Sequence, residues 1–135
     1  MLINPEKTKF PVVGSRPMLQ NVPIEMSLTF LGKTIRPVFI AKDLGINLDS
    51  YLSYDDHISQ LVSTCMRKLC LINRVKDSFD NETLKLVIES LVINKLLYCS
   101  TVWSNTSSNN INKLQAVQNF ACRIITGAGK FDHVT

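Results

Sequence analysis

The stretch AKDLGINLDSYLSYDDHI, residues 41–58, is where the hydrophobic pattern of this chain changes its period. Ile46 and Leu48 alternate with the polar residues Asn47 and Asp49, and a period of two is typical of a half-buried strand. After this stretch, apolar residues recur at intervals of three and four, as they do on one face of a helix. The stretch therefore predicts a strand, a short turn and a long helix.

The long helix is expected to run from Tyr54 to Val75. Ser53 stands at the N-cap position, where its hydroxyl can accept a backbone N–H. Asp55 and Asp56 fall in the first turn, where the positive end of the helix dipole favours carboxylates. The apolar residues expected to share the inner face are Ile58, Leu61, Val62, Cys65, Leu69 and Ile72.

The first third of the chain has strand character and no helical periodicity. Pro11 and Pro37 cannot donate to a ladder and are expected at sheet edges. A loop over Ser15–Pro23 and a turn at Leu31–Gly32 would connect the strands. The expected strand segments are Thr8–Gly14, Ile24–Phe30 with alternate residues on one face, the irregular arm Lys33–Ile40, and Lys42–Leu48.

Two further helices are expected after the first. Asp80 is placed to cap a helix over Asn81–Val102, and the polar loop Ser104–Asn110 ends in a cap for a helix over Ile111–Thr126, which Gly127 terminates. The third helix is expected to turn inward Ile111, Leu114, Val117, Ala121 and Ile124. The sequence thus predicts an α+β fold with a small N-terminal antiparallel β-sheet of three to four strands in residues 1–52. A three-helix bundle follows in residues 53–135.

Composition indicates one ordinary globular domain in size, with 135 residues of which 45% are apolar and 19% charged. Fifteen Lys and Arg against eleven Asp and Glu give a net charge of +4. A modest excess of this kind favours polyanion binding only slightly, because many enzymes carry as much. No apolar run reaches the roughly twenty residues that a membrane-spanning helix needs, so no membrane partner is expected.

The four cysteines lie in apolar helical patterns without the paired C-x-x-C spacing of structural zinc sites. Cys65 and Cys70 are about 140° apart around a helix and cannot face one metal together. We therefore expect no metal site, and buried free thiols in a reducing, intracellular compartment, cytoplasmic or nuclear.

Tyr54-Asp55-Asp56 has two interpretations. Adjacent carboxylates after an aromatic residue resemble the polymerase site that holds two Mg²⁺ ions, but that site needs a tight hairpin between apolar strands. Here the pair continues directly into helical periodicity, which favours a capping role. We expect no catalytic residue at these positions.

Arg67 and Arg74 share the outer face of the first helix with Gln60, at a spacing of seven. Such a stripe is more often a solvated face than a phosphate-contacting one. The chain contains no phosphate-binding loop, dinucleotide fingerprint or Ser/His/Asp arrangement. Periodicity and composition therefore predict a fold but no function.

Several segments, in this order, resemble the end of a reverse transcriptase of the jockey-like group of non-LTR retrotransposons. The resemblance extends from about Leu2 to Val134, and Tyr98–Trp103 also fits the aromatic helix end of that family. The segments that carry it are Asn4-Pro5-Glu6-Lys7-Thr8, Lys42–Asp49, Leu52-Ser53 with His57-Ile58, and Leu114–Asn119 with Arg123, Ile124, Thr126 and Gly127.

This resemblance implies that residues 1–52 are a remnant of a polymerase palm and residues 53–135 a thumb-like domain. It implies that Lys7 lies near the incoming nucleotide and that Leu44 and Gly45 belong to an element resembling the primer grip. The partner implied is an RNA/DNA template–primer duplex, bound weakly and electrostatically. Candidate phosphate contacts are Arg67, Arg74, Lys113 and Arg123, of which Arg123 matches the family pattern.

The catalytic aspartates and the fingers of such an enzyme would lie before Met1, and Phe131–Thr135 resembles the start of a further segment. The chain therefore resembles a fragment of an RNA-directed DNA polymerase that lacks the catalytic carboxylates. Mg²⁺ is expected only in the full-length enzyme. Two alternatives remain open: a domesticated nucleic-acid-binding module, and a helical protein-interaction domain.

The first prediction is that the isolated chain has no polymerase activity, because two-metal chemistry needs carboxylates that this sequence does not place on a suitable hairpin. Primer extension on a primed RNA template with Mg²⁺ should equal that of a heat-killed control. Extension above that control would contradict the prediction.

Overall fold

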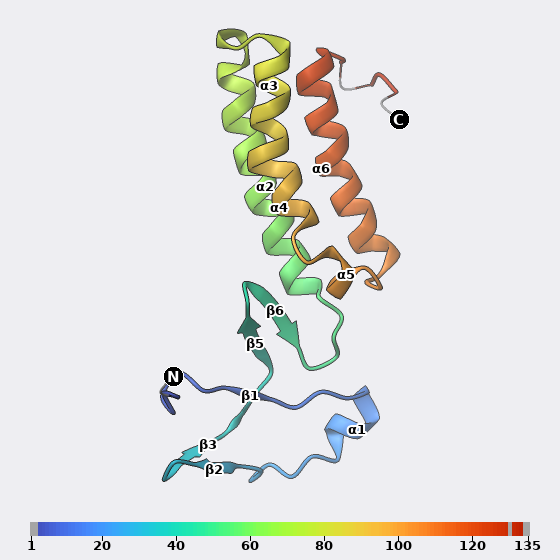
Figure 1. The fold of residues 1–135 in the computed structure, drawn as a ribbon. Helices are drawn as coiled ribbons and strands as arrows, with labels where there is room; N and C mark the ends of the chain where they lie inside the picture. Colours follow the sequence, from blue (N-terminus) through green and yellow to red (C-terminus); the bar gives the residue numbers. More distant parts are fainter. Residues whose placement is uncertain (1–2, 130, 134–135) are drawn as a thin grey trace. The chain divides into compact units, whose positions relative to one another are not determined.

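The structure is a computed structural model that describes residues 3–129 and 131–133. It divides the chain into two compact units, Met1–His57 and Ile58–Thr135. The described residues of the first form short strands, a short helix and the start of a long one, and those of the second are helical (Figure 1). The fold is therefore mixed α+β, as the sequence predicts in general terms.

Within the described part of the first unit, the strands form three separate two-stranded pairs. The predicted single antiparallel sheet is wrong in this respect, because β1 pairs with β4 in parallel while β2–β3 and β5–β6 are antiparallel. The strands are β1 (Phe10–Pro11), β2 (Leu28–Phe30), β3 (Lys33–Ile35), β4 (Pro37–Val38), β5 (Ile40–Asp43) and β6 (Ile46–Asp49).

Prolines explain why the β1–β4 pair is so short. Pro11 and Pro37 each occupy one of the two positions in their strand, and neither can donate a ladder hydrogen bond. The segment expected to be a loop, Ser15–Pro23, contains the short helix α1 (Arg16–Gln20), with Pro17 in its first turn. Proline is favoured there because its missing N–H would have no helical partner.

The β2–β3 hairpin turns at Leu31 and Gly32, as the sequence predicts. The strand expected over Ile24–Phe30 is shorter, because the N–H of Met26 closes a turn onto the carbonyl of Pro23 at 3.0 Å. Ile24, assigned to the inner face by the alternation, is fully exposed.

A second hairpin replaces the single strand expected over Lys42–Leu48. β5 and β6 pair with Asp43 opposite Ile46, so Leu44 and Gly45 form a two-residue turn. Both turn residues have positive φ, 46° and 87°, which is the signature of a type I′ turn. Leu44 is an unusual residue for this conformation, which is why alternation alone missed the turn.

The carboxylate of Asp49 orders the connection from β6 to the next helix. It accepts hydrogen bonds from the N–H groups of Tyr54, Ser53 and Tyr51, at 2.8, 3.1 and 3.3 Å, and from the Ser53 hydroxyl at 3.0 Å. Burial alone would raise the pKa of Asp49. The hydrogen bonds to the charged carboxylate outweigh burial, so the pKa of Asp49 lies below the usual 3.8. The cluster holds Tyr54 at a φ of 61°, a conformation that ordinary residues rarely adopt.

Helix α2 (Asp55–Val75) begins one residue later than predicted. Ser53 contributes to its start as expected, since its hydroxyl accepts the N–H of Asp55 at 3.4 Å. The inner face is confirmed at five positions and Val62 is half-buried. The buried residues are Ile58, Leu61, Cys65, Leu69 and Ile72.

A 3₁₀ turn, Lys76–Ser78, follows α2. The helix expected over Asn81–Val102 is broken into shorter parts. Asp80 caps it as predicted, accepting the N–H of Thr83. The parts are α3 (Asn81–Ile88), a π-helical segment (Glu89–Ile93), α4 (Asn94–Leu97) and α5 (Ser100–Trp103).

Two features accommodate the breaks in this helix. Lys68 of α2 donates to the carbonyl of Leu91 at 3.1 Å, in the π-helical segment. At the second break Cys99 has a φ of 51°, and the indole N–H of Trp103 donates to the carbonyl of Tyr98 at 3.3 Å.

Helix α6 (Ser108–Thr126) starts three residues earlier than predicted. Ser107, rather than the end of the polar loop, is the cap, and it accepts the N–H of Asn110, which lies buried inside the helix. Gly127 ends the helix with a φ of 68°, as predicted. Val117, Ala121 and Ile124 are buried, whereas the predicted inner residues Leu114 and Ile111 are half-buried and exposed.

In the helical unit, α2, the α3–α4 segment and α6 run side by side (Figure 1). The core consists of the buried side chains that these helices turn toward one another. Over residues 3–129 and 131–133, no helix combines the length and apolar character needed to cross a membrane.

The second prediction concerns Asp49. Replacing Asp49 by Asn should lower the free energy of unfolding at pH 7 by about 1–3 kcal/mol, because hydrogen bonds to a charged acceptor are lost or weakened. A carboxyl with a lowered folded pKa stabilises the fold above its unfolded value, and this contribution is lost as pH falls through the folded pKa. The variant should therefore lose less stability than the parent when the pH is lowered below 3.8.

Urea denaturation between pH 7 and pH 3 measures both effects. The exposed Asp43→Asn, in the same hairpin, is the matched control and should behave like the parent. Equal pH dependence of the Asp49 variant and the parent would contradict the prediction.

Candidate functional site

A groove lies between α2 and α6 in the helical unit, with a cavity volume of about 630 Å³. Met66 and Asn73 of α2 line one side, and residues of α6 line the other. The lining residues from α6 and its end are Ala116, Asn119, Phe120, Arg123, Ile124 and Ala128, and Lys76 follows the end of α2. The groove is thus lined by apolar side chains together with polar and cationic groups.

Of the described residues that line this groove, the charged ones are two cations, Lys76 and Arg123, and none is a carboxylate. The ion pairs found among the described residues, Lys33–Glu6 and Lys85–Glu89, lie elsewhere. The Nε atom of Arg123 is buried and has no hydrogen-bond partner in the described part of the chain. A buried donor without a partner is unusual in a folded protein, and guanidinium donors match phosphate or carboxylate oxygens.

The position of Arg123 also has a structural explanation. It lies in the last turn of α6, where the negative end of the helix dipole favours a cation. The dipole accounts for the charge at this position, but it does not provide a hydrogen-bond acceptor for the buried Nε atom.

The other predicted phosphate contacts do not line the groove. Arg67 and Arg74 are exposed, and each follows a groove residue of α2, about 100° further around the helix. Lys113 is half-buried near the start of α6 and donates to the side-chain oxygen of Asn110 at 3.4 Å.

Lys7 and the Leu44–Gly45 pair belong to the N-terminal unit. Lys7 is exposed in a turn, where its N–H donates to the carbonyl of Asn4 at 3.1 Å. Asn4 also accepts the N–H of Glu6 and the hydroxyl of Thr8, so the Asn-x-x-Lys-Thr segment is a compact turn. Leu44 is 80% exposed at the tip of its hairpin.

Asp55 and Asp56 lie in the first turn of α2. This confirms that the pair opens a helix rather than standing on a hairpin. Within the described ranges, no group of three or more His, Cys, Asp or Glu side chains could hold a metal ion.

The prediction that all four cysteines are buried is wrong. Cys65 is fully buried, Cys99 is half-buried, and Cys70 and Cys122 are exposed. A helix with many apolar residues carries some of its apolar residues on the outer face, so an apolar pattern does not by itself show that a cysteine is buried. Burial raises the pKa of the Cys65 thiol, although Lys95 and Lys68 partly oppose this. Cys65 therefore behaves as a small apolar core residue.

Comparison with known proteins adds one finding. Over 129 residues, 92% of this chain, the sequence is 29% identical to a Drosophila melanogaster protein named probable RNA-directed DNA polymerase from transposon BS. The chain is similar to part of a transposon polymerase. It spans 14% of the length of that relative, which supports a reverse-transcriptase-related fragment. No protein-family model and no solved structure matches the chain.

Sequence reasoning identified Arg123 through resemblance but missed Lys76. Lys76 lies just after α2, in the 3₁₀ turn Lys76–Ser78, where helical spacing no longer indicates which face a residue occupies. One sequence signal could have indicated Lys76. It follows the basic stripe of α2 and lies seven residues, about two helical turns, after Leu69, which is on the inner face.

The third prediction is that changing Asp55 and Asp56 together to Asn weakens the start of α2 by about 0.3–1 kcal/mol per charge, through the lost dipole interaction. Thermal unfolding measures this loss. Isothermal titration with Mg²⁺ should show no binding to the parent or the variant. Mg²⁺ binding that the double change removes would contradict the prediction.

Proposed function

We propose that this chain is a segment of a jockey-like non-LTR retrotransposon reverse transcriptase, in which residues 53–135 form a thumb-like domain that contacts a template–primer duplex. In this proposal residues 1–52 are the remnant of the palm. Two observations support it: the similarity to a transposon polymerase over 92% of the chain, and the family-like segments in the same order along the sequence.

The α2–α6 groove is the observation that carries the nucleic-acid role. Among the described residues, no carboxylate lines the groove with its two cations, and the buried Nε of Arg123 has no acceptor. A phosphate group would supply both the negative charge and the missing oxygen. Lys76 would act as a second point charge on the same backbone.

The remaining proposed contacts lie outside this groove. Arg67 and Arg74 would follow the neighbouring phosphates along the outer face of α2, and Lys113 would add a weaker contact on α6. Contacts of this kind position a duplex without reading its bases. Binding should therefore depend steeply on salt and little on sequence.

The N-terminal unit has positioning roles in this proposal. Lys7 would lie near the incoming nucleotide, and the Leu44–Gly45 turn would contact the primer end. In the full-length enzyme, Mg²⁺ would be held by carboxylates outside this chain. The proposed location is intracellular, in the cytoplasm or nucleus.

The fourth prediction tests the groove. Lys76→Gln with Arg123→Gln should weaken binding of the chain to a labelled, primed RNA/DNA duplex at low salt. The slope of log affinity against log salt should fall by about two, one for each lost phosphate contact, to the same extent for different sequences. Fluorescence anisotropy across a salt series measures both quantities.

The matched control is Lys85→Gln with Lys95→Gln, which removes the same charge from exposed positions on α3 and α4. It should leave most of the slope intact. Equal losses in the two double variants would show a general charge effect and overturn the groove as the contact site. Parent-like binding by the groove variant would overturn it as well.

A further inference from the structure

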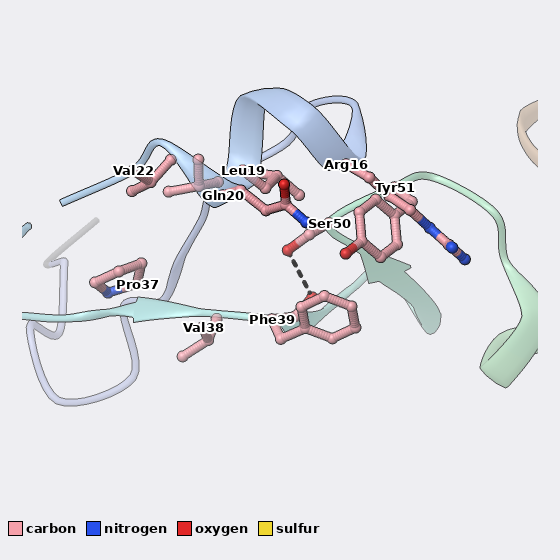
Figure 2. Close-up of a pocket in the computed structure, with 10 residues that line it drawn as sticks. Arg16, Leu19, Gln20, Val22, Pro37, Val38, Phe39, Ser50 and Tyr51 are labelled. Atoms are coloured by element: carbon pink, nitrogen blue, oxygen red, sulfur yellow. Dashed lines mark hydrogen bonds between the residues drawn. The ribbon is translucent and has the colours of Figure 1, made fainter. Parts of the chain in front are cut away.

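A second groove lies in the N-terminal unit, in which α1 and the segment after it face β4 and the residue that follows it (Figure 2). Leu19, Gln20 and Val22 lie on one side, and Pro37 and Val38 on the other. Its cavity volume is about 330 Å³, at the small end of the range for ligand pockets.

Two aromatic rings and one cation occupy one end of this groove. The rings of Phe39 and Tyr51 meet edge to face, with centroids 5.5 Å apart, and the guanidinium carbon of Arg16 lies 5.6 Å from the Tyr51 centroid. Phe39 is 55% exposed and Tyr51 42% exposed. Arg16 is the sole charged residue among the described residues that line the groove.

Hydrogen bonds fix the backbone that carries the two rings. The N–H and the hydroxyl of Ser50 both donate to the carbonyl of Phe39, at 3.0 and 3.2 Å. The N–H of Gly14 donates to the carbonyl of Ser50 at 3.0 Å, and the N–H of Tyr51 donates to Asp49. The exposed aromatic surface is therefore preorganised rather than carried on a free loop, which lowers the ordering cost of binding a ligand.

We propose that this groove binds an unpaired nucleotide of a single-stranded nucleic acid. The base packs on the exposed face of Phe39, beside Tyr51, and the phosphate pairs with Arg16. An aromatic surface favours a flat π system, and the Arg16 cation, in a groove that no described carboxylate lines, favours an anion. A nucleotide combines the two, and aromatic stacking with a cationic contact is how proteins hold single strands without reading sequence.

This proposal goes beyond the duplex contact proposed above, because it uses other residues, in the other unit, and a different form of nucleic acid. The two can therefore fail separately. The groove of Lys76 and Arg123 is proposed to bind the phosphate backbone of a duplex, whereas the groove of Arg16 and Phe39 requires an unpaired base.

The experiment measures anisotropy of a fluorescein-labelled oligothymidylate with the full chain, and with the full chain carrying Lys76→Gln and Arg123→Gln. In both backgrounds Phe39→Leu should weaken binding about tenfold, because stacking is lost while apolar volume remains. Arg16→Gln should lower the salt slope by about one. A strand of equal length and charge but without bases should bind about as weakly to the parent as the intact strand binds to Phe39→Leu.

The matched controls are Phe79→Leu, at an exposed phenylalanine of the helical unit, and Arg36→Gln, at an exposed arginine outside the groove. Both should bind like the parent, and far-ultraviolet circular dichroism should be the same for all variants. The ring-proton NMR signals of Tyr51 should shift when the strand is added. Parent-like binding by Phe39→Leu, equal affinity for the baseless strand, or unchanged Tyr51 signals would each overturn the proposal.

Discussion

The connection between β6 and α2 depends on the hydrogen bonds that the carboxylate of Asp49 accepts. Four donors from residues 51–54 converge on it, and this segment contains two non-glycine residues with positive φ, Leu52 and Tyr54. Such residues cost free energy unless surrounding contacts fix them. The hydrogen bonds to Asp49 supply those contacts. One of them comes from the N–H of Tyr51. The rings of Tyr51 and Phe39 line the groove of the N-terminal unit, which is called the aromatic groove below.

The sequence predicted the helices better than the strands, for a physical reason. Helical periodicity arises from local geometry, so the spacing of Ile58, Cys65 and Leu69 alone indicated α2 and its inner face. Strand pairing depends on partners distant in sequence, and alternation did not reveal that prolines would limit the β1–β4 pair to two positions. Asp49 continued an alternating pattern as a polar residue, although the structure buries it as an acceptor of backbone N–H groups.

The candidate sites show a similar division. The basic residues of α2 and α6 were visible as patterns, but a groove forms where two helices pack, and a linear pattern does not show which residues meet there. Arg123 and Lys76 line one cavity although 47 positions separate them in the sequence. The aromatic groove escaped sequence reasoning because α1 fell in a segment expected to be a loop, and because Phe39 and Tyr51 belong to different segments that the Ser50–Phe39 hydrogen bonds bring together.

The two units also differ in how their candidate sites are supported. Among the described residues, Met1–His57 buries three apolar side chains and Ile58–Thr135 buries thirteen. Isolated two-stranded pairs are marginally stable in water, so the N-terminal unit should open at a lower free energy than the helical bundle. The α2–α6 groove is therefore formed by helices that pack around a hydrophobic core, whereas the aromatic groove is held by a few hydrogen bonds. Protonation of Asp49 would weaken its hydrogen bond to the N–H of Tyr51 and so loosen the aromatic groove.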